Sequence, residues 1–184
     1  MNHGILLVDD EPNVLSALER ALIDESYTIY SAGNGDEGLE LLSRAKVKVI
    51  VSDERMPGMG GAEFLSRVKD LYPQVVRIML TGHASVESTM KAVNRGEIYR
   101  FFIKPWDDTD LILSLRSAVE KYDMEEENRR LLRTVKRQSH ELKILEDRFP
   151  GISAMNRDES GRYILPDISD EEVEKIIAAY CKET

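Results

Sequence analysis

Four apolar runs of the sequence each end in polar side chains. These side chains are three carboxylates, a hydroxyl and an ammonium, from Asp9, Asp10, Asp53, Thr81 and Lys104. In an open parallel α/β sheet, the carboxyl ends of the strands form the edge at which ligands bind. One nucleophilic carboxylate, two further carboxylates, a hydroxyl and an ammonium at such an edge suit divalent-metal and phosphoryl chemistry.

The aspartates predict a bound cation. Asp9, Asp10 and Asp53 at one sheet edge would repel one another, and without a cation at least one pKa should rise. Mg²⁺ prefers oxygen ligands and usually takes one or two carboxylates from a protein. An aspartate carboxylate can attack phosphorus to form an acyl phosphate. The phosphoryl charge would then be neutralised by the metal ion, the Lys104 ammonium and the Thr81 hydroxyl.

Alternating strand and helix patterns over residues 1–118 must position these side chains. The expected strands are Gly4–Val8, Tyr27–Ser31, Val47–Ser52, Val75–Leu80 and Ile98–Ile103. The expected helices are Pro12–Ile23, Asp36–Arg44, Ala62–Leu71, Ser85–Asn94 and a long helix from about Asp107. Such a (βα)5 alternation predicts an α/β fold, with a parallel five-stranded sheet between layers of helices.

These motifs resemble the receiver domain of two-component response regulators. The motifs that carry the resemblance, within about residues 3–122, are Asp9-Asp10, Asp53 followed by Met56-Pro57-Gly58-Met59-Gly60-Gly61, Thr81-Gly82, and Lys104-Pro105. The resemblance implies a doubly wound sheet of strand order 2-1-3-4-5. It also implies that the protein accepts a phosphoryl group from a sensor histidine kinase and passes a conformational change to a partner.

The resemblance assigns roles at the metal and phosphoryl site. Asp53 is expected to be the phosphoacceptor. Asp10 is expected to be the principal Mg²⁺ ligand, with Asp9 contributing directly or through water. The backbone carbonyl of Arg55 completes the implied ligand set.

Further roles follow from the same resemblance. Thr81 is expected to hydrogen-bond the phosphoryl group, and Lys104 to pair with it. Phe101, three residues before this lysine, matches an aromatic that acts as a rotameric switch; the alternative is an ordinary core aromatic. The Lys104–Pro105 bond is expected to be cis, which is accessible because only X–Pro bonds adopt cis at low cost.

A helix with a coiled-coil pattern follows the predicted receiver. Five apolar and two polar residues recur at alternating steps of three and four: Asn128, Leu131, Val135, Gln138, Leu142, Leu145 and Phe149. Asn128 at an a position favours a defined dimer register, so we expect a homodimer. The alternative is a solvated helix that packs back on the domain. The apolar positions up to Tyr122 do not continue in the same helical phase into Asn128 and Leu131. We therefore expect a hinge within residues 122–127.

The sequence predicts three segments: a receiver at residues 1–122, a coiled-coil extension at 123–149 and a small tail at 150–184. In the tail, strand-like runs around a Gly-containing turn suggest a hairpin. Ser169 and Glu172 form a capping box that opens a final helix.

Composition narrows the classes of partner. The formal net charge is −9, without a basic surface in either half, so we expect no nucleic-acid partner. The single cysteine, Cys181, fits a reducing compartment. No run approaches the roughly 18–20 apolar residues of a membrane span, and the first strand leaves no room for a signal peptide. We expect a cytoplasmic protein without a membrane partner.

The output is less defined by sequence. Residues 123–184 contain no helix-turn-helix, phosphodiesterase, cyclase or kinase motif. We therefore expect no enzyme activity beyond self-catalysed phosphorylation and dephosphorylation, and an output protein of unknown identity. The alternative is the input half, or a relic, of a larger regulator with an enzymatic output such as a cyclic-dinucleotide phosphodiesterase. A receiver-like module that only binds conflicts with the complete set of acidic, Thr and Lys residues.

Overall fold

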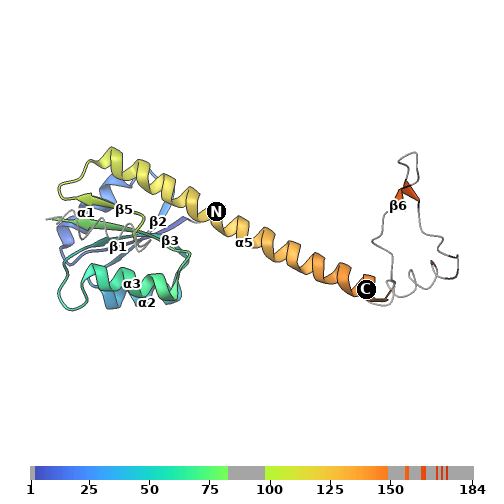
Figure 1. Cartoon of the computed structure of the whole chain (residues 1–184). Coiled ribbons are helices and arrows are strands. Elements are labelled where there is room, and N and C mark those ends of the chain that lie inside the picture. Colours follow the sequence, from blue (N-terminus) through green and yellow to red (C-terminus); the bar gives the residue numbers. More distant parts are fainter. Residues whose placement is uncertain are drawn as a thin grey trace. The chain divides into compact units, whose positions relative to one another are not determined.

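A computed structural model describes residues 3–82 and 98–148, with residues 156, 157, 163, 164, 169, 171 and 173. Its main sheet has five strands in the order β2-β1-β3-β4-β5, and all neighbouring strands are parallel (Figure 1). The strands are β1 (His3–Val8), β2 (Tyr27–Ala32), β3 (Val47–Asp53), β4 (Val76–Thr81) and β5 (Arg100–Ile103). The predicted fold class and strand order are confirmed.

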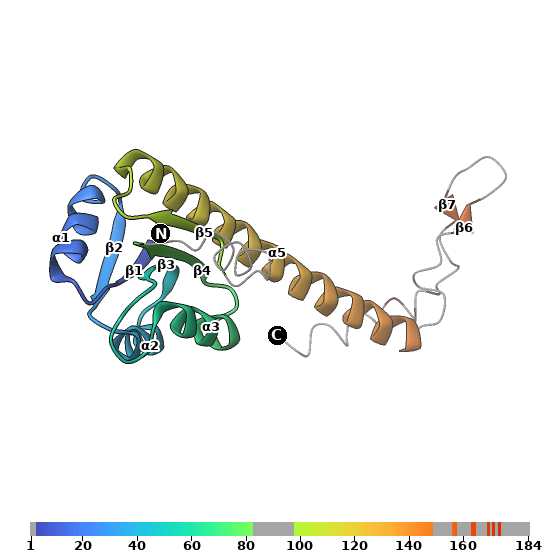
Figure 2. The same ribbon diagram turned by 60° about the vertical axis from the view of Figure 1, so that its left-hand side comes forward.

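Helices cover both faces of this sheet. They are α1 (Pro12–Ala21), α2 (Gly35–Arg44), α3 (Gly61–Leu71) and α5 (Asp108–Arg148). The first part of α5 packs with α1 on one face, and α2 and α3 lie on the other (Figures 1 and 2). The predicted helix Ser85–Asn94 lies outside the described residues.

The alternation of strand side chains builds two apolar layers. Along β1, Ile5 and Leu7 join the cluster with α1 and α5, whereas Leu6 and Val8 join the cluster with α2 and α3. Successive side chains of a strand point to opposite faces, so a strand covered on both sides is expected to be apolar along most of its length. All seven residues of β3 are accordingly buried.

Local signals explain where the helices begin. Pro12 stands in the first turn of α1, where its missing N–H costs no hydrogen bond. Asn34 caps α2 by accepting a 2.9 Å hydrogen bond from the backbone N–H of Glu37. These caps fix the first turns that follow β1 and β2.

The observed boundaries differ slightly from the predicted ones. Helix α1 ends at Ala21 rather than Ile23, whose side chain is 77% exposed and gains no packing from a longer helix. Strand β4 continues to Thr81 because this polar residue is itself fully buried and paired with Ile103 of β5. Strand β5 begins only at Arg100.

Helix α5 belongs to the core over its first part only. Its buried residues are Leu111, Ser114, Leu115, Ala118, Val119 and Tyr122. The helix continues without a break to Arg148, so the phase change within residues 122–127 does not interrupt the backbone. The chain divides into two compact units, Met1–Arg129 and Arg130–Thr184. Among the described helices, none is both long and apolar enough to span a membrane.

In the second unit, β6 (Asn156–Arg157) and β7 (Tyr163–Ile164) form an antiparallel pair. The backbone N–H of Val173 donates to the carbonyl of Ser169 at 3.1 Å, within the segment where a capping box is predicted. The segment limits at 122/123 and 149/150 remain predictions.

A buried lysine joins the N-terminal end of β3 to α5. The side chain of Lys48 is 5% exposed, and its Nζ lies 2.5 Å from Asp123 Oδ1 and 2.9 Å from His3 Nδ1. Gly4 pairs with Val47 and Ile5 with Val49, so Lys48 is the additional residue of a bulge. Bulges redirect side chains. Here the bulge accompanies a lysine in an otherwise apolar run.

Replacing Asp123 with Ala should destabilise the protein by about 1–3 kcal/mol, because it leaves the buried Lys48 ammonium without a carboxylate. This loss is smaller than for a fully buried pair because the Asp123 side chain is 42% exposed. Urea unfolding measures the loss. The control is Glu40→Ala, which removes an exposed ion pair with Arg44 and should cost at most about 0.5 kcal/mol. Equal losses in the two variants would contradict the role of Lys48.

Candidate functional site

The carboxyl ends of the strands bring four of the predicted residues together. We call Asp9, Asp53, Thr81 and Lys104 the strand-end cluster. The ammonium of Lys104 lies 2.8 Å from Asp9 Oδ2 and 2.6 Å from Asp53 Oδ1. The residues follow or end β1, β3, β4 and β5, and parallel strands place such ends at one edge. One cation thus links two carboxylates that are 44 residues apart in the sequence (53 − 9).

Burial determines the electrostatics of the cluster. Asp9 is 1% exposed, and burial raises its pKa above 3.8, although hydrogen bonds from Lys104 and the Glu11 N–H oppose the rise. Burial acts to lower the pKa of Lys104, but its hydrogen bonds to Asp53 and Asp9 outweigh burial and raise the pKa above 10.5. The rise at Asp9 comes chiefly from burial, and repulsion from Asp53 is the smallest contribution, so mutual repulsion of the carboxylates is not its main cause.

Backbone groups orient the carboxylate of Asp53. The backbone N–H of Arg55 donates to Asp53 Oδ2 at 2.6 Å, while Asp53 Oδ1 faces Lys104. The loop then turns at Gly58, whose φ of +77° lies in the region that favours glycine. Asp53 thus presents a side chain of 9% exposure with a defined orientation.

The hydroxyl of Thr81 has a partner that the sequence did not indicate. Thr81 is fully buried, and its Oγ1 donates a 2.5 Å hydrogen bond to Glu54 Oε2. The Thr81 carbonyl accepts the backbone N–H of Lys104 at 2.8 Å. Glu54 is thereby a member of the site that sequence reasoning missed, since a lone carboxylate after Asp53 carries no spacing signal.

Asp10 and Phe101, two further predicted site residues, are near Asp9 and Lys104 in the sequence. Asp10 is exposed at the end of β1, beside buried Asp9. Phe101 is half-buried and packs against the layer with α2 and α3. The Lys104–Pro105 bond is cis, as predicted.

A preassembled metal centre is not present among the described residues. Within residues 3–82 and 98–148, no three His, Cys, Asp or Glu side chains are grouped closely enough to hold a metal ion. The donor types nevertheless fit Mg²⁺, since Asp9, Asp10, Asp53 and the Arg55 carbonyl all offer oxygen. The Lys104 ammonium already forms ion pairs with two of these carboxylates, Asp9 and Asp53, and its single charge offsets half of their combined charge.

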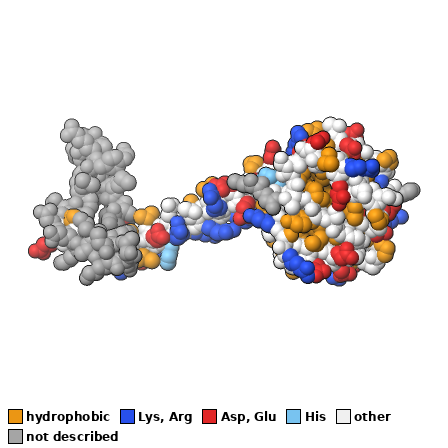
Figure 3. Space-filling view, turned by 180° about the vertical axis from the view of Figure 1, so that it is seen from behind, with side chains coloured by type: hydrophobic (Ala, Val, Ile, Leu, Met, Phe, Trp, Pro, Cys, Tyr) orange, Lys and Arg blue, Asp and Glu red, His pale blue; other side chains and the backbone are white. Residues whose placement is uncertain are grey.

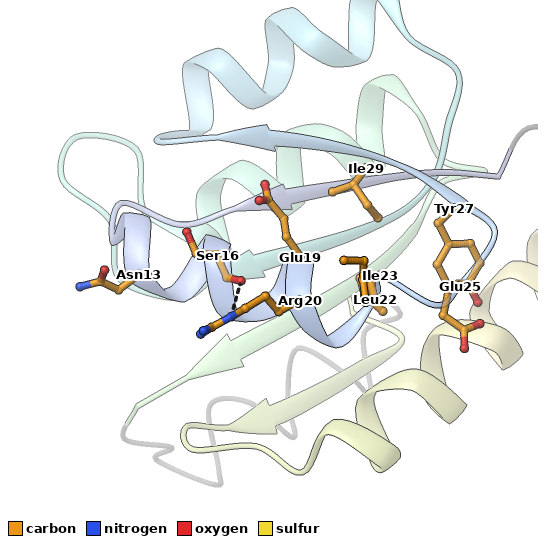
Figure 4. A pocket seen from close by; sticks show the side chains of 9 residues that line it. All are labelled: Asn13, Ser16, Glu19, Arg20, Leu22, Ile23, Glu25, Tyr27 and Ile29. Atoms are coloured by element: carbon orange, nitrogen blue, oxygen red, sulfur yellow. Dashed lines mark hydrogen bonds between the residues drawn. The ribbon is translucent and has the colours of Figure 1, made fainter.

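A groove elsewhere on this unit does not involve the strand-end cluster. It has a volume of about 850 Å³ and lies between α1 and β2, with Ser16, Glu19, Ile23 and Tyr27 among its lining residues (Figure 4). Around the rounded part of the face seen in Figure 3, acidic, basic and apolar side chains are interspersed. The groove offers no convergent set of catalytic groups, so chemistry favours the strand-end cluster as the functional site.

The sequence matches the family model of the response regulator receiver domain over residues 5–116. The chain belongs to this family. A solved receiver agrees in fold: the signal receiver domain of an HD domain-containing protein from Pseudomonas fluorescens Pf-5 has a TM-score of 0.64 and 38% identity, covering 67% of this chain and 99% of that one. The receiver is the phosphoacceptor module of two-component signal relay, and the resemblance seen in the motifs is confirmed.

Curated relatives are longer than this receiver chain. The hydrogenase transcriptional regulatory protein HoxA of Cupriavidus necator is 39% identical over 127 residues, or 69% of this chain and 26% of that protein. The C4-dicarboxylate transport transcriptional regulatory protein DctD of Rhizobium meliloti is 30% identical over 175 residues, or 95% of this chain and 36% of that protein. The chain thus spans about a quarter to a third of these relatives.

Proposed function

We propose that Asp53 accepts a phosphoryl group from a sensor histidine kinase. A carboxylate oxygen of Asp53 attacks phosphorus, the P–N bond of a phosphohistidine breaks, and the released imidazole takes up a proton. The observation that carries this proposal is the position of Asp53, within 2.6 Å of the Lys104 ammonium and held by the Arg55 N–H. Preorganised donors of this kind stabilise charge that develops during transfer.

The remaining site residues receive roles from their chemistry. Asp10, Asp9, Asp53 and the Arg55 carbonyl would hold Mg²⁺, which supplies charge neutralisation for phosphoryl oxygens when bound. Lys104 would pair with the phosphoryl group because its ammonium already faces Asp53. Thr81 would donate its hydroxyl to the same group, and the half-buried Phe101 would change rotamer with it.

The output is proposed to pass through α5. Its described part beyond Tyr122 exposes apolar side chains, with Leu131, Val135 and Leu142 each more than half exposed. These are a and d positions of the predicted coiled coil, which supports a homodimer. A change in the receiver would alter that dimer or its contact with an output protein.

The names of the longer relatives favour one kind of output. HoxA and DctD are named as transcriptional regulatory proteins, so a transcriptional role for a longer protein of this kind is favoured over a cyclic-dinucleotide phosphodiesterase output. That this chain itself binds no nucleic acid remains a prediction from its net charge of −9. Its cytoplasmic location and its lack of enzyme activity beyond phosphoryl transfer to itself also remain predictions.

The proposed function is tested by intact mass after incubation with Mg²⁺ and acetyl phosphate. The wild-type chain should gain one phosphoryl adduct, and Asp53→Asn should gain none because an amide is not a nucleophile here. Asp36→Asn, at the exposed start of α2, is the matched control and should react like the wild type. An adduct that persists in Asp53→Asn would place the phosphoacceptor elsewhere.

A further inference from the structure

The hydroxyl of Thr81 has only one proton to donate. In this structure it donates that proton to Glu54 Oε2 at 2.5 Å, a length typical of a hydrogen bond to a charged acceptor. A phosphoryl group on Asp53 would need the same proton. Glu54 and the phosphoryl group are therefore competitors for one donor.

The backbone of Glu54 holds this competitor in place. Its N–H donates to the carbonyl of Leu80 at 2.8 Å, and its own carbonyl accepts the N–H of Gly61 at 2.9 Å. Glu54 is thus fixed between the end of β4 and the start of α3. Only its side chain remains to be released when Thr81 changes partner.

We propose that Glu54 is a positioning residue that retains the Thr81 hydroxyl in the unphosphorylated protein and so opposes the switch. The proposal rests on the proposed function, in which Thr81 donates to the phosphoryl group. Loss of the charged acceptor should favour the phosphorylated arrangement, since a hydrogen bond to a charged group contributes more than a neutral one. Two conformations compete, and the acceptor on Glu54 shifts their populations.

The test uses the full chain and beryllofluoride with Mg²⁺ as the phosphoryl analogue. Glu54→Gln keeps the shape but offers a neutral acceptor, and Glu54→Ala removes the acceptor. We expect half-saturation at a roughly tenfold lower beryllofluoride concentration for Glu54→Ala, with a smaller decrease for Glu54→Gln. The control Glu40→Ala removes a carboxylate from the exposed side of α2 and should bind like the wild type.

Two further measurements separate this role from simple removal of a negative charge. The methyl resonance of Thr81 in unliganded Glu54→Ala should move toward its position in the beryllofluoride-bound wild type. In a double-mutant cycle with Thr81→Val, which has no hydroxyl, the Glu54→Gln substitution should have no effect on half-saturation. A charge effect alone would leave the methyl resonance in place and would persist with Thr81→Val.

The outcomes are distinguishable. Unchanged half-saturation and an unchanged Thr81 resonance in both Glu54 variants would overturn the proposal while the wild type still binds beryllofluoride. If Glu54→Ala does not fold, Glu54→Gln and its cycle with Thr81→Val give the decision. Asp53→Asn tests the proposed function separately. If the wild type and Asp53→Asn respond to beryllofluoride in the same way, the proposed function fails, whatever the result for the Glu54 variants.

Discussion

Lys104→Met should slow adduct formation from acetyl phosphate roughly 100- to 1000-fold, the usual cost of removing one donor from a developing charge. Met has a similar length but carries no charge. Without added metal, the same variant should lose about 2–4 kcal/mol of unfolding free energy, because two carboxylates lose their shared cation. This loss stays below that of a fully buried pair because the Lys104 side chain is 19% exposed. Lys46→Met on the surface is the control.

The loss of stability should depend on pH in a defined direction. Without Lys104, its hydrogen bond and its charge no longer oppose the burial that raises the pKa of Asp9 above 3.8, and only the Glu11 N–H still does, so this pKa rises further. A raised carboxyl pKa favours the folded state at low pH, and that contribution is lost as pH rises through the folded pKa. The deficit of Lys104→Met should therefore be largest near neutral pH and shrink on acidification.

In the wild type, the charged Lys104 contributes to the free energy of unfolding, and this contribution is lost at high pH rather than at low pH. Because its pKa is raised above 10.5, its contribution is complete below that value and is lost as pH rises through the raised pKa. Urea unfolding over a series of pH values measures both effects. A deficit that is constant from acid to neutral pH would contradict the coupling between Lys104 and Asp9.

Gly61→Ala should disrupt both folding and phosphorylation. A Cβ at Gly61 would lie 1.8 Å from the Asp53 carbonyl oxygen and 2.8 Å from its carbonyl carbon. Both are backbone atoms that cannot turn aside, so the strand end or the start of α3 must move. Overpacking of this kind costs about 3 kcal/mol. A displacement near 1 Å at a reacting group can cost roughly 100-fold in rate.

The neighbouring glycine provides the control for this prediction. A Cβ at Gly60 would meet only the Glu54 carbonyl oxygen, at an ordinary 3.7 Å. Gly60→Ala should therefore cost no more than about 1 kcal/mol, chiefly through its N-cap position. Unfolding free energy and adduct rate are measured for both variants. Similar values for Gly60→Ala and Gly61→Ala would show that the close approach is relieved without cost.

The sequence predicted the sheet and most of the site because these depend on local patterns. Four of the five strands lie in apolar runs that end in polar residues, so parallel pairing alone brings Asp9, Asp53 and Lys104 to one edge. The fifth expected helix, residues 85–94, lies outside the described part of the chain. Met56 and Met59, in the loop after Asp53, are buried in the layer with α2 and α3.

Other contacts could not be predicted because they join distant residues without a repeated spacing. Glu54 and Thr81 are 27 residues apart, and either one alone is an ordinary polar residue. Lys48 and Asp123 are 75 residues apart, and a lysine in a strand pattern usually faces water. Asp10 is expected to be the principal metal ligand, but its side chain is exposed. The ion pair with Lys104 is formed by the neighbouring Asp9.

The central position of β3 in the sheet affects how a change at Asp53 could reach α5. This strand is hydrogen-bonded to β1 on one side and β4 on the other, so its amides, such as those of Ile50 and Val51, should exchange with deuterium only through global opening. Lys48, near one end, holds Asp123 of α5, and Asp53 stands at the other end, about 17 Å away along the strand. A signal that travels this way would shift an intact strand as one body, without melting any of it.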